Sequence, residues 1–151
     1  SDEGFALFFS DPPPAMLNRE VATVLRPFPF GLMTGAGLVA ANAAQADAAL
    51  QARFATSAYH GAGVWSWQQA LMAAGLARQL QRRDLPAATR AMLADAQGRL
   101  WAAITATRPL ANSELWSWRW ANGGYQVVPF GAGTADADES NAAQLWSTVY
   151  L

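Results

Sequence analysis

Two helix-forming segments, residues 63–82 and 85–106, are joined by a short turn and differ in where their apolar side chains fall. The first is apolar on nearly all sides until Arg78, which is typical of a helix that is buried on several sides. The second has apolar residues every three to four positions with charged residues between them, so one of its faces is solvated. Asp84 and Pro86 supply an N-cap and a first-turn proline between the two.

A buried helix tied by a tight turn to a one-sided helix is an αα-hairpin with an inner and an outer member. Stacked in a ring, such hairpins form an α/α toroid, which fits this pair better than a simple four-helix bundle does. Elsewhere the sequence predicts a helix at about 14–25, extended backbone at 26–31, where prolines restrict the chain, and a helix at about 36–53. Residues 115–129 break the helical pattern, because alternation, the turn signal N-G-G and a return strand predict a β-hairpin.

Composition excludes several functional classes. The 151 residues suffice for one domain with a core, and 52% of them are apolar against 14% charged. A net charge of −1 argues against nucleic acid or an anionic membrane surface as the main partner. Without cysteine there are no disulfides, catalytic thiolates or cysteine-ligated zinc, and the single histidine, His60, argues against a histidine-rich metal site. No phosphate-binding loop is present, and we expect no metal and no cofactor.

The chain ends in an unusual way. Residues 138–151, D-E-S-N-A-A-Q-L-W-S-T-V-Y-L, begin with helix-capping residue types and run into an apolar stretch that has no stop signal. The low charge agrees with a surface that another part of the protein covers. We therefore expect residues 1–151 to be a portion of a longer or cleaved protein.

The stretch Y-H-G-A-G-V-W-S-W at 59–67 is an unusual beginning for a helix. It places Tyr59, His60, Trp65 and Trp67 beside small residues, directly before a run of alanine and leucine. Aromatic residues crowded at the start of a helix can form a well-packed corner. They can also line a pocket for a flat ligand covered with hydroxyl groups.

Glu114 stands next to three tryptophans at the start of the predicted hairpin. A carboxylate among aromatic rings can have its pKa raised by desolvation and can act as a general acid or base. The alternative interpretation is a carboxylate that is paired with Arg108 or Arg119 at the start of a strand.

Alternation places Trp116, Trp118 and Trp120 on one face of the first strand of this hairpin. Three indoles in line can be part of the core against the helices. They can also form a platform for sugar rings, because the C–H faces of a pyranose are apolar while its edges form hydrogen bonds.

Three stretches, taken together and in order, resemble a known family. Y-H-G-A-G-V-W-S-W-Q-Q-A-L at 59–71, S-E-L-W at 113–116 and A-Q-L-W-S-T-V-Y-L at 143–151 are similar to motifs of bacterial glycogen-debranching enzymes of the amylo-α-1,6-glucosidase type and of glucoamylases. The resemblance covers roughly residues 26–151. These are six-hairpin glycosidases, so the resemblance implies that the chain is mainly α, the C-terminal part of one (α/α)₆ toroid with a β-hairpin inserted near 115–129.

The resemblance also implies a reaction. The family hydrolyses α-glucosidic bonds of glycogen and oligosaccharides with inversion and without a cofactor, and Glu114 matches its general base. Glu139, directly before the closing helix motif, is the alternative base. The general acid matches no part of this chain, so the missing N-terminal part of the protein is an expected partner, and this chain alone is expected to be inactive. An inverting pair of carboxyl groups lies roughly 6.5–9.5 Å apart.

The same resemblance implies which residues bind the α-glucan or gluco-oligosaccharide. They are Tyr59, His60, Trp65, Trp67, Trp116 and Gln144. Ala62, Ser66 and Ser113 depart from the family pattern, standing where it has glycine, proline and proline. Two other functions remain open: a non-catalytic carbohydrate-binding helical domain, and a helical scaffold whose tryptophans are all core.

Overall fold

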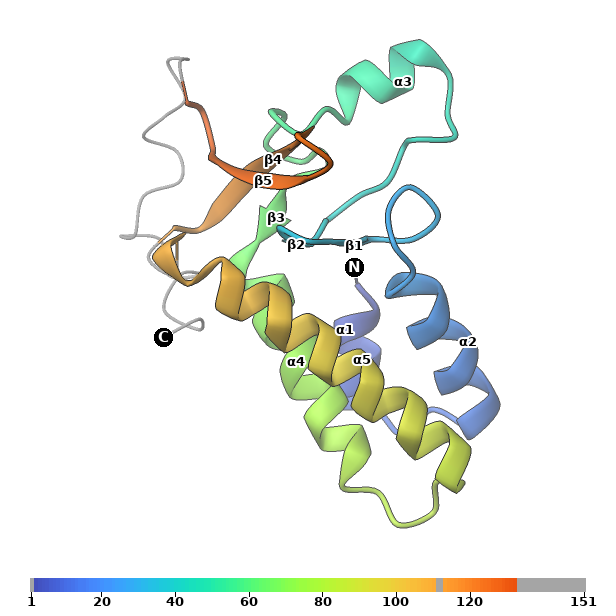
Figure 1. Ribbon diagram of the computed structural model, residues 1–151. Coiled ribbons are helices and arrows are strands. Elements are labelled where there is room, and N and C mark those ends of the chain that lie inside the picture. Colours follow the sequence, from blue (N-terminus) through green and yellow to red (C-terminus); the bar gives the residue numbers. More distant parts are fainter. Residues whose placement is uncertain (1, 111–112, 133–151) are drawn as a thin grey trace.

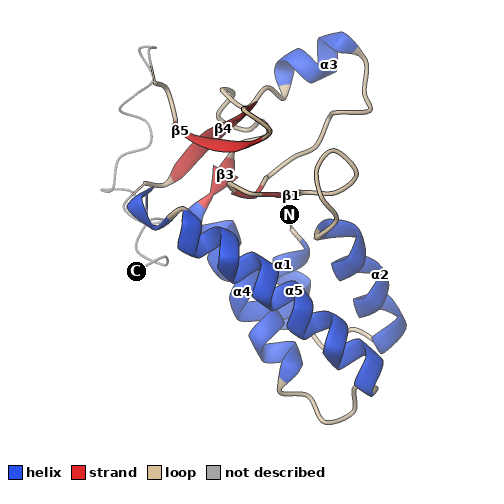
Figure 2. Ribbon diagram, viewed as in Figure 1, coloured by secondary structure: helices blue, strands red, loops and turns tan. Residues whose placement is uncertain are grey.

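The computed structural model describes residues 2–110 and 113–132. In chain order the elements are α1 (Glu3–Phe9), α2 (Pro14–Val24), β1 (Met33–Thr34), β2 (Gly37–Leu38), α3 (Ala48–Arg53), β3 (Val64–Trp65), α4 (Ser66–Leu80), α5 (Ala87–Ala106), a 3₁₀ turn (Arg108–Leu110), β4 (Leu115–Ala121) and β5 (Gly124–Pro129). Figures 1 and 2 show α1, α2, α4 and α5 gathered at one end, with the strands and α3 at the other.

The predicted (α/α)₆ toroid is wrong. Within the described residues, five α-helices and two small antiparallel sheets form a mixed α/β domain. The αα-hairpin itself is present as α4 and α5, but α4 packs on its other side against α1, and its N-terminal end adjoins β3. The hydrophobic pattern of a helix reports how many of its sides are buried and does not report what covers them, so it could not distinguish a ring from this arrangement.

The predicted helices at 14–25, 63–82 and 85–106 are confirmed as α2, α4 and α5, with small differences at their ends. Helix α4 needs apolar residues on several sides because α1 and α5 both contact it. Gly75 allows the close approach of α1, since a Cβ at that position would stand 2.7 Å from the Cβ of Leu7. Leucine and methionine side chains from the four helices fill the space between them, among them Leu7, Leu17, Met72, Leu76, Leu93 and Leu100.

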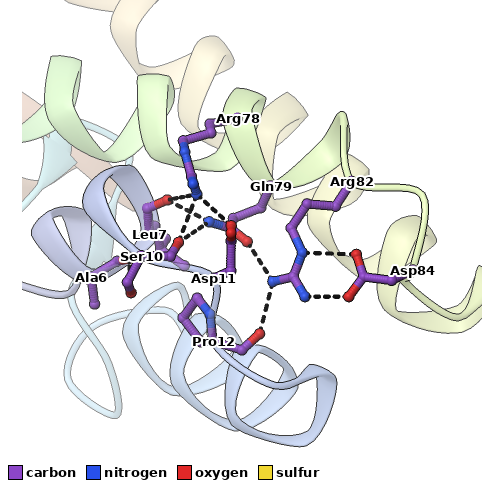
Figure 3. Close-up of polar contacts among 9 residues, drawn as sticks. All are labelled: Ala6, Leu7, Ser10, Asp11, Pro12, Arg78, Gln79, Arg82 and Asp84. Carbon is purple, nitrogen blue, oxygen red and sulfur yellow. Dashed lines mark hydrogen bonds and ion pairs between the residues drawn. The ribbon is translucent and has the colours of Figure 1, made fainter.

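Polar side chains near the end of α4 hold the chain that leaves α1 (Figure 3). The buried Gln79 donates through Nε2 to the carbonyl oxygens of Leu7, at 2.5 Å, and Ser10, at 2.9 Å. Arg78 donates to the Ser10 carbonyl at 2.6 Å and forms an ion pair with Asp11 at 2.8 Å. The last carbonyl groups of a helix have no hydrogen-bond partner within the helix. Gln79 and Arg78 supply donors for these groups at the end of α1.

Arg82 extends the same network toward α5 (Figure 3). Its guanidinium donates to the Pro12 carbonyl at 2.8 Å and to Gln79 Oε1 at 2.9 Å. It also forms a bidentate pair with Asp84, and this hydrogen bonding lowers the pKa of the Asp84 carboxyl. The expectation that Asp84 caps α5 is therefore wrong: the N-cap position is Pro86, which makes no side-chain cap bond.

Replacing Gln79 with alanine is expected to lower the free energy of unfolding by about 1–3 kcal/mol, because the buried Leu7 carbonyl would lose its short hydrogen bond from the Gln79 amide. Urea denaturation measures this change. Gln81→Ala, at an exposed glutamine two positions on, is the matched control and should change stability by less than about 0.5 kcal/mol. Equal effects of the two substitutions would show that the Gln79 amide does not hold α1.

The predicted β-hairpin at 115–129 is confirmed as β4 and β5. Trp116 pairs with Pro129 and Ala121 with Gly124, which leaves Asn122 and Gly123 as a two-residue turn. Both turn residues have positive φ, 54° and 75°, as a type I′ turn requires. Strand β3 adds to the other edge of β4, so the sheet order is β3-β4-β5.

The predicted helix at 36–53 is wrong except for its last turns, which are α3. Gly37 has φ 126° in the β1–β2 hairpin, and the Leu38 amide donates to Gln69 Oε1 at 3.1 Å. The Asn42 side chain donates to the carbonyl groups of Pro29 and Gly31, both at 2.9 Å. These contacts with distant segments outweigh the helix propensity of the alanine-rich stretch, which is a weak preference.

Candidate functional site

The pairing of β3 with β4 brings the start of α4 beside Glu114. Val64 lies opposite Trp116 and Trp65 opposite Leu115. The backbone N–H and the hydroxyl of Ser66 both donate to the Glu114 carbonyl oxygen, each at 2.9 Å. Two sequence motifs that are about 50 residues apart along the chain are therefore joined at one point, where a strand turns into a helix.

Tyr59 is the centre of an aromatic cluster at this junction. Its ring meets Trp65 edge-on at a centroid distance of 4.8 Å, His60 at 4.9 Å and Phe130 at 5.9 Å. The rings of His60 and Trp65 are nearly parallel, with an angle of 10° and a centroid distance of 6.0 Å. Edge-to-face contacts of this kind are favourable beyond the area that they bury, so they fix the orientation of the tyrosine.

A hollow of about 330 Å³ opens beside this cluster. Four of the residues that the sequence singled out, Tyr59, His60, Trp65 and Trp67, line it together with Gln68. The methyl groups of Ala40 and Ala41 complete its wall. Its size lies at the lower end of the range for small-molecule sites, about 300–1,000 Å³. The first turn of α4 and the segment before β3 thus form an aromatic pocket as well as a packed corner.

Glu114 lies behind the wall of this hollow. Its side chain is fully buried, and the Tyr59 hydroxyl donates to both carboxylate oxygens, at 3.3 Å to Oε1 and 3.2 Å to Oε2. Among the described residues that line the hollow, none carries a carboxylate. The carboxylate is therefore one hydrogen bond away from the hollow and not on its surface. Arg119, one suggested ion-pair partner, donates instead to Gln126 at 3.0 Å.

The tryptophans of β4 divide between core and surface. Trp116 is fully buried and donates through Nε1 to the Ala36 carbonyl at 2.8 Å, so its ring offers no face to a ligand. Trp118 is also buried and donates to the Ala62 carbonyl at 2.7 Å. Trp120 is 61% exposed and packs edge-on against Tyr125. The core interpretation thus holds for Trp116 and Trp118, and a continuous three-indole platform is not formed.

Some site predictions lie beyond the described residues. Glu139, the alternative base, and Gln144, from the closing motif, both fall in 133–151, so their positions stay predictions.

Three lining residues were not found from the sequence. Ala40 and Ala41 were assigned to a helix, and nothing in an alanine-rich stretch indicates a pocket wall. Gln68 had a usable signal, because it is a polar residue that directly follows Trp67 in the first turn of α4.

Within residues 2–110 and 113–132, no group of three or more histidine and acidic side chains could hold a metal ion. No helix in the same part of the chain is both long and apolar enough to cross a membrane. No protein-family model, curated protein or solved structure matches the chain. The likeness to glycogen-debranching enzymes therefore rests on the three sequence stretches alone.

Proposed function

We propose that the hollow beside Tyr59 binds a glucose unit of a gluco-oligosaccharide. The observation that carries this proposal is an aromatic-walled hollow of about 330 Å³ whose tyrosine is held by a buried carboxylate. Small-molecule sites are mostly apolar and contain a few well-placed polar groups. This combination suits a pyranose, which has apolar C–H faces and hydroxyl groups around its edge.

The residues that line the hollow include both apolar walls and polar groups. The indoles of Trp65 and Trp67 supply flat apolar walls, and His60 and Gln68 supply donors and acceptors for hydroxyl groups. His60 is exposed and packs nearly parallel to Trp65, so it can contact a ligand without any rearrangement of the core. Within the described part of the chain, the lining contains no carboxylate, lysine or arginine, which favours an uncharged ligand.

Glu114 supports the pocket from behind. A buried carboxylate is costly unless it accepts hydrogen bonds, and the Tyr59 hydroxyl donates one that is shared between its two oxygens. The bond in turn holds the Tyr59 ring against Trp65. In this role Glu114 is a positioning residue.

Replacing Trp67 with alanine is expected to weaken maltose binding at least about tenfold, because the pocket would lose one aromatic wall. Isothermal titration calorimetry measures this change without relying on tryptophan emission. His60→Ala, at an exposed position, should weaken binding while lowering the free energy of unfolding by no more than about 1.5 kcal/mol. Trp101→Ala, at an exposed tryptophan on α5, is the control and should leave the affinity unchanged. If unmodified protein showed no saturable heat with maltose or isomaltose, the proposal would fail.

A second candidate function is hydrolysis of α-glucosidic bonds with inversion, in which Glu114 acts as general base. The observation that favours it is the position of the carboxylate, one hydrogen bond behind the sugar pocket. The base would accept a proton from the water that attacks the anomeric carbon. The reaction also requires a general acid, supplied by a longer form of the protein, to protonate the departing oxygen. For this, Tyr59 must turn away and let water reach Glu114.

A further inference from the structure

We infer that the saccharide site continues from the hollow onto α1, where Phe5 and Phe9 form an aromatic track for further sugar units of a linear gluco-oligosaccharide. The inference rests on the proposed function, and it names the preferred ligand as a chain of several units and not a mono- or disaccharide.

The track is continuous with the pocket. Trp67 lines the hollow, and its ring meets that of Phe5 edge-on with centroids 5.9 Å apart. The Phe5 and Phe9 rings, four residues apart on one face of α1, are nearly parallel, with an angle of 15° and a centroid distance of 6.3 Å. Aromatic surface therefore runs without interruption from the wall of the pocket to the far end of α1.

The two phenylalanines are directed toward solvent. Phe5 is 45% exposed and Phe9 is 71% exposed, whereas Leu7 of the same helix is fully buried. The helix therefore has an inner face that packs in the core and a separate aromatic face that does not. Contiguous exposed apolar patches often mark surfaces that bind a ligand or a partner.

Helix α1 is held firmly in position. A helix of seven residues is not stable alone in water, so its position depends on its contacts. Gly75 lets it lie close against α4, and the buried Gln79 binds the carbonyl groups of Leu7 and Ser10 (Figure 3). A platform that is fixed before binding loses little entropy when a ligand settles on it.

The chemistry of the track favours a neutral glycan. The helix, E-G-F-A-L-F-F, has one charged residue, so it does not attract a polyanion by charge. Continuity with a pocket proposed to bind glucose favours the next units of the same chain over a protein partner. Successive pyranose rings present apolar faces that can rest on Trp67, Phe5 and Phe9 in turn.

The test compares maltose with maltohexaose by calorimetry. Unmodified protein should bind maltohexaose at least about tenfold more tightly than maltose. The double variant Phe5→Ala/Phe9→Ala should still bind maltose with saturable heat, and should bind both sugars within about twofold of each other. Phe9→Ala alone, which leaves the Phe5–Trp67 contact in place, should remove part of the preference. Phe30→Ala, at a 76% exposed phenylalanine between α2 and β1, is the control and should retain all of it.

Three results would overturn the inference. If the double variant kept the preference for maltohexaose, Phe5 and Phe9 would not be part of the saccharide site. The pocket proposal would be unaffected by that result. A dimer that forms in unmodified protein and is lost in the double variant would assign this face to contact between copies. If neither sugar bound to unmodified protein, the pocket proposal would fail and the track with it.

Discussion

Replacing Trp116 with alanine is expected to lower the free energy of unfolding by about 3–5 kcal/mol, the usual effect of removing a large aromatic ring from a core. Domains of this kind are stable by about 5–15 kcal/mol, so the variant would be close to unfolding. Trp116 is fully buried, pairs with Val64 in β3, and donates to the Ala36 carbonyl, so it joins β4 to β3 and to the β1–β2 hairpin. Urea denaturation at 25 °C measures the change.

Two further variants separate the contributions of Trp116. Trp116→Phe retains an aromatic ring but leaves the Ala36 carbonyl without the indole donor, so a loss of about 1–3 kcal/mol is expected. Trp120→Ala, on the same strand but exposed, should lower the free energy of unfolding by no more than about 1.5 kcal/mol, since it loses only the edge-on contact with Tyr125. If Trp116→Ala were no more destabilising than Trp120→Ala, the assignment of Trp116 to the core would be wrong.

The second large effect concerns Glu114→Gln, measured in the longer protein that the glycosidase proposal requires. If Glu114 is the general base, turnover of an α-glucan should fall by about 10²–10⁴-fold, because glutamine cannot accept the proton. Affinity for maltose should change little, since the glutamine carbonyl can still accept the hydrogen bond from Tyr59. Steady-state hydrolysis and calorimetry on the same samples separate the two quantities.

Glu139→Gln tests the rival base. Loss of turnover in that variant, with near-full turnover in Glu114→Gln, would transfer the role to Glu139. If the longer protein that the glycosidase proposal requires bound maltose without any substitution but hydrolysed no α-glucan, the non-catalytic carbohydrate-binding function would be the correct one.

Secondary-structure predictions were confirmed where the residues of one short segment were enough to determine its conformation. The turn residues Asn122 and Gly123 specify a two-residue hairpin connection through their positive φ angles, and the prediction for 115–129 holds. The periodicity of 85–106 likewise predicted α5, because the outer member of a helical hairpin has one buried face.

Predictions failed where distant segments decided the outcome. The segment 36–53 has high helix propensity, yet Gln69 and the Asn42 contacts hold its first part in a hairpin and a loop. Val64 and Trp65 were assigned to the helix of α4, but pairing with β4 makes them a strand. The toroid failed for the same reason, because α1, which the sequence did not single out, packs against α4.

The candidate site shows the same division. Residue types alone pointed to Tyr59, His60, Trp65 and Trp67 as one aromatic group, because they are neighbours along the chain and at the start of one helix. That Glu114 lies behind Tyr59 depends on a strand pairing between segments about 50 residues apart. The sequence by itself thus determined the elements whose signal is local, such as the hairpin at 115–129 and α5, and the aromatic chemistry of 59–67. Only the tertiary structure decided which side chains meet, because burial and strand pairing are properties of the whole packed chain.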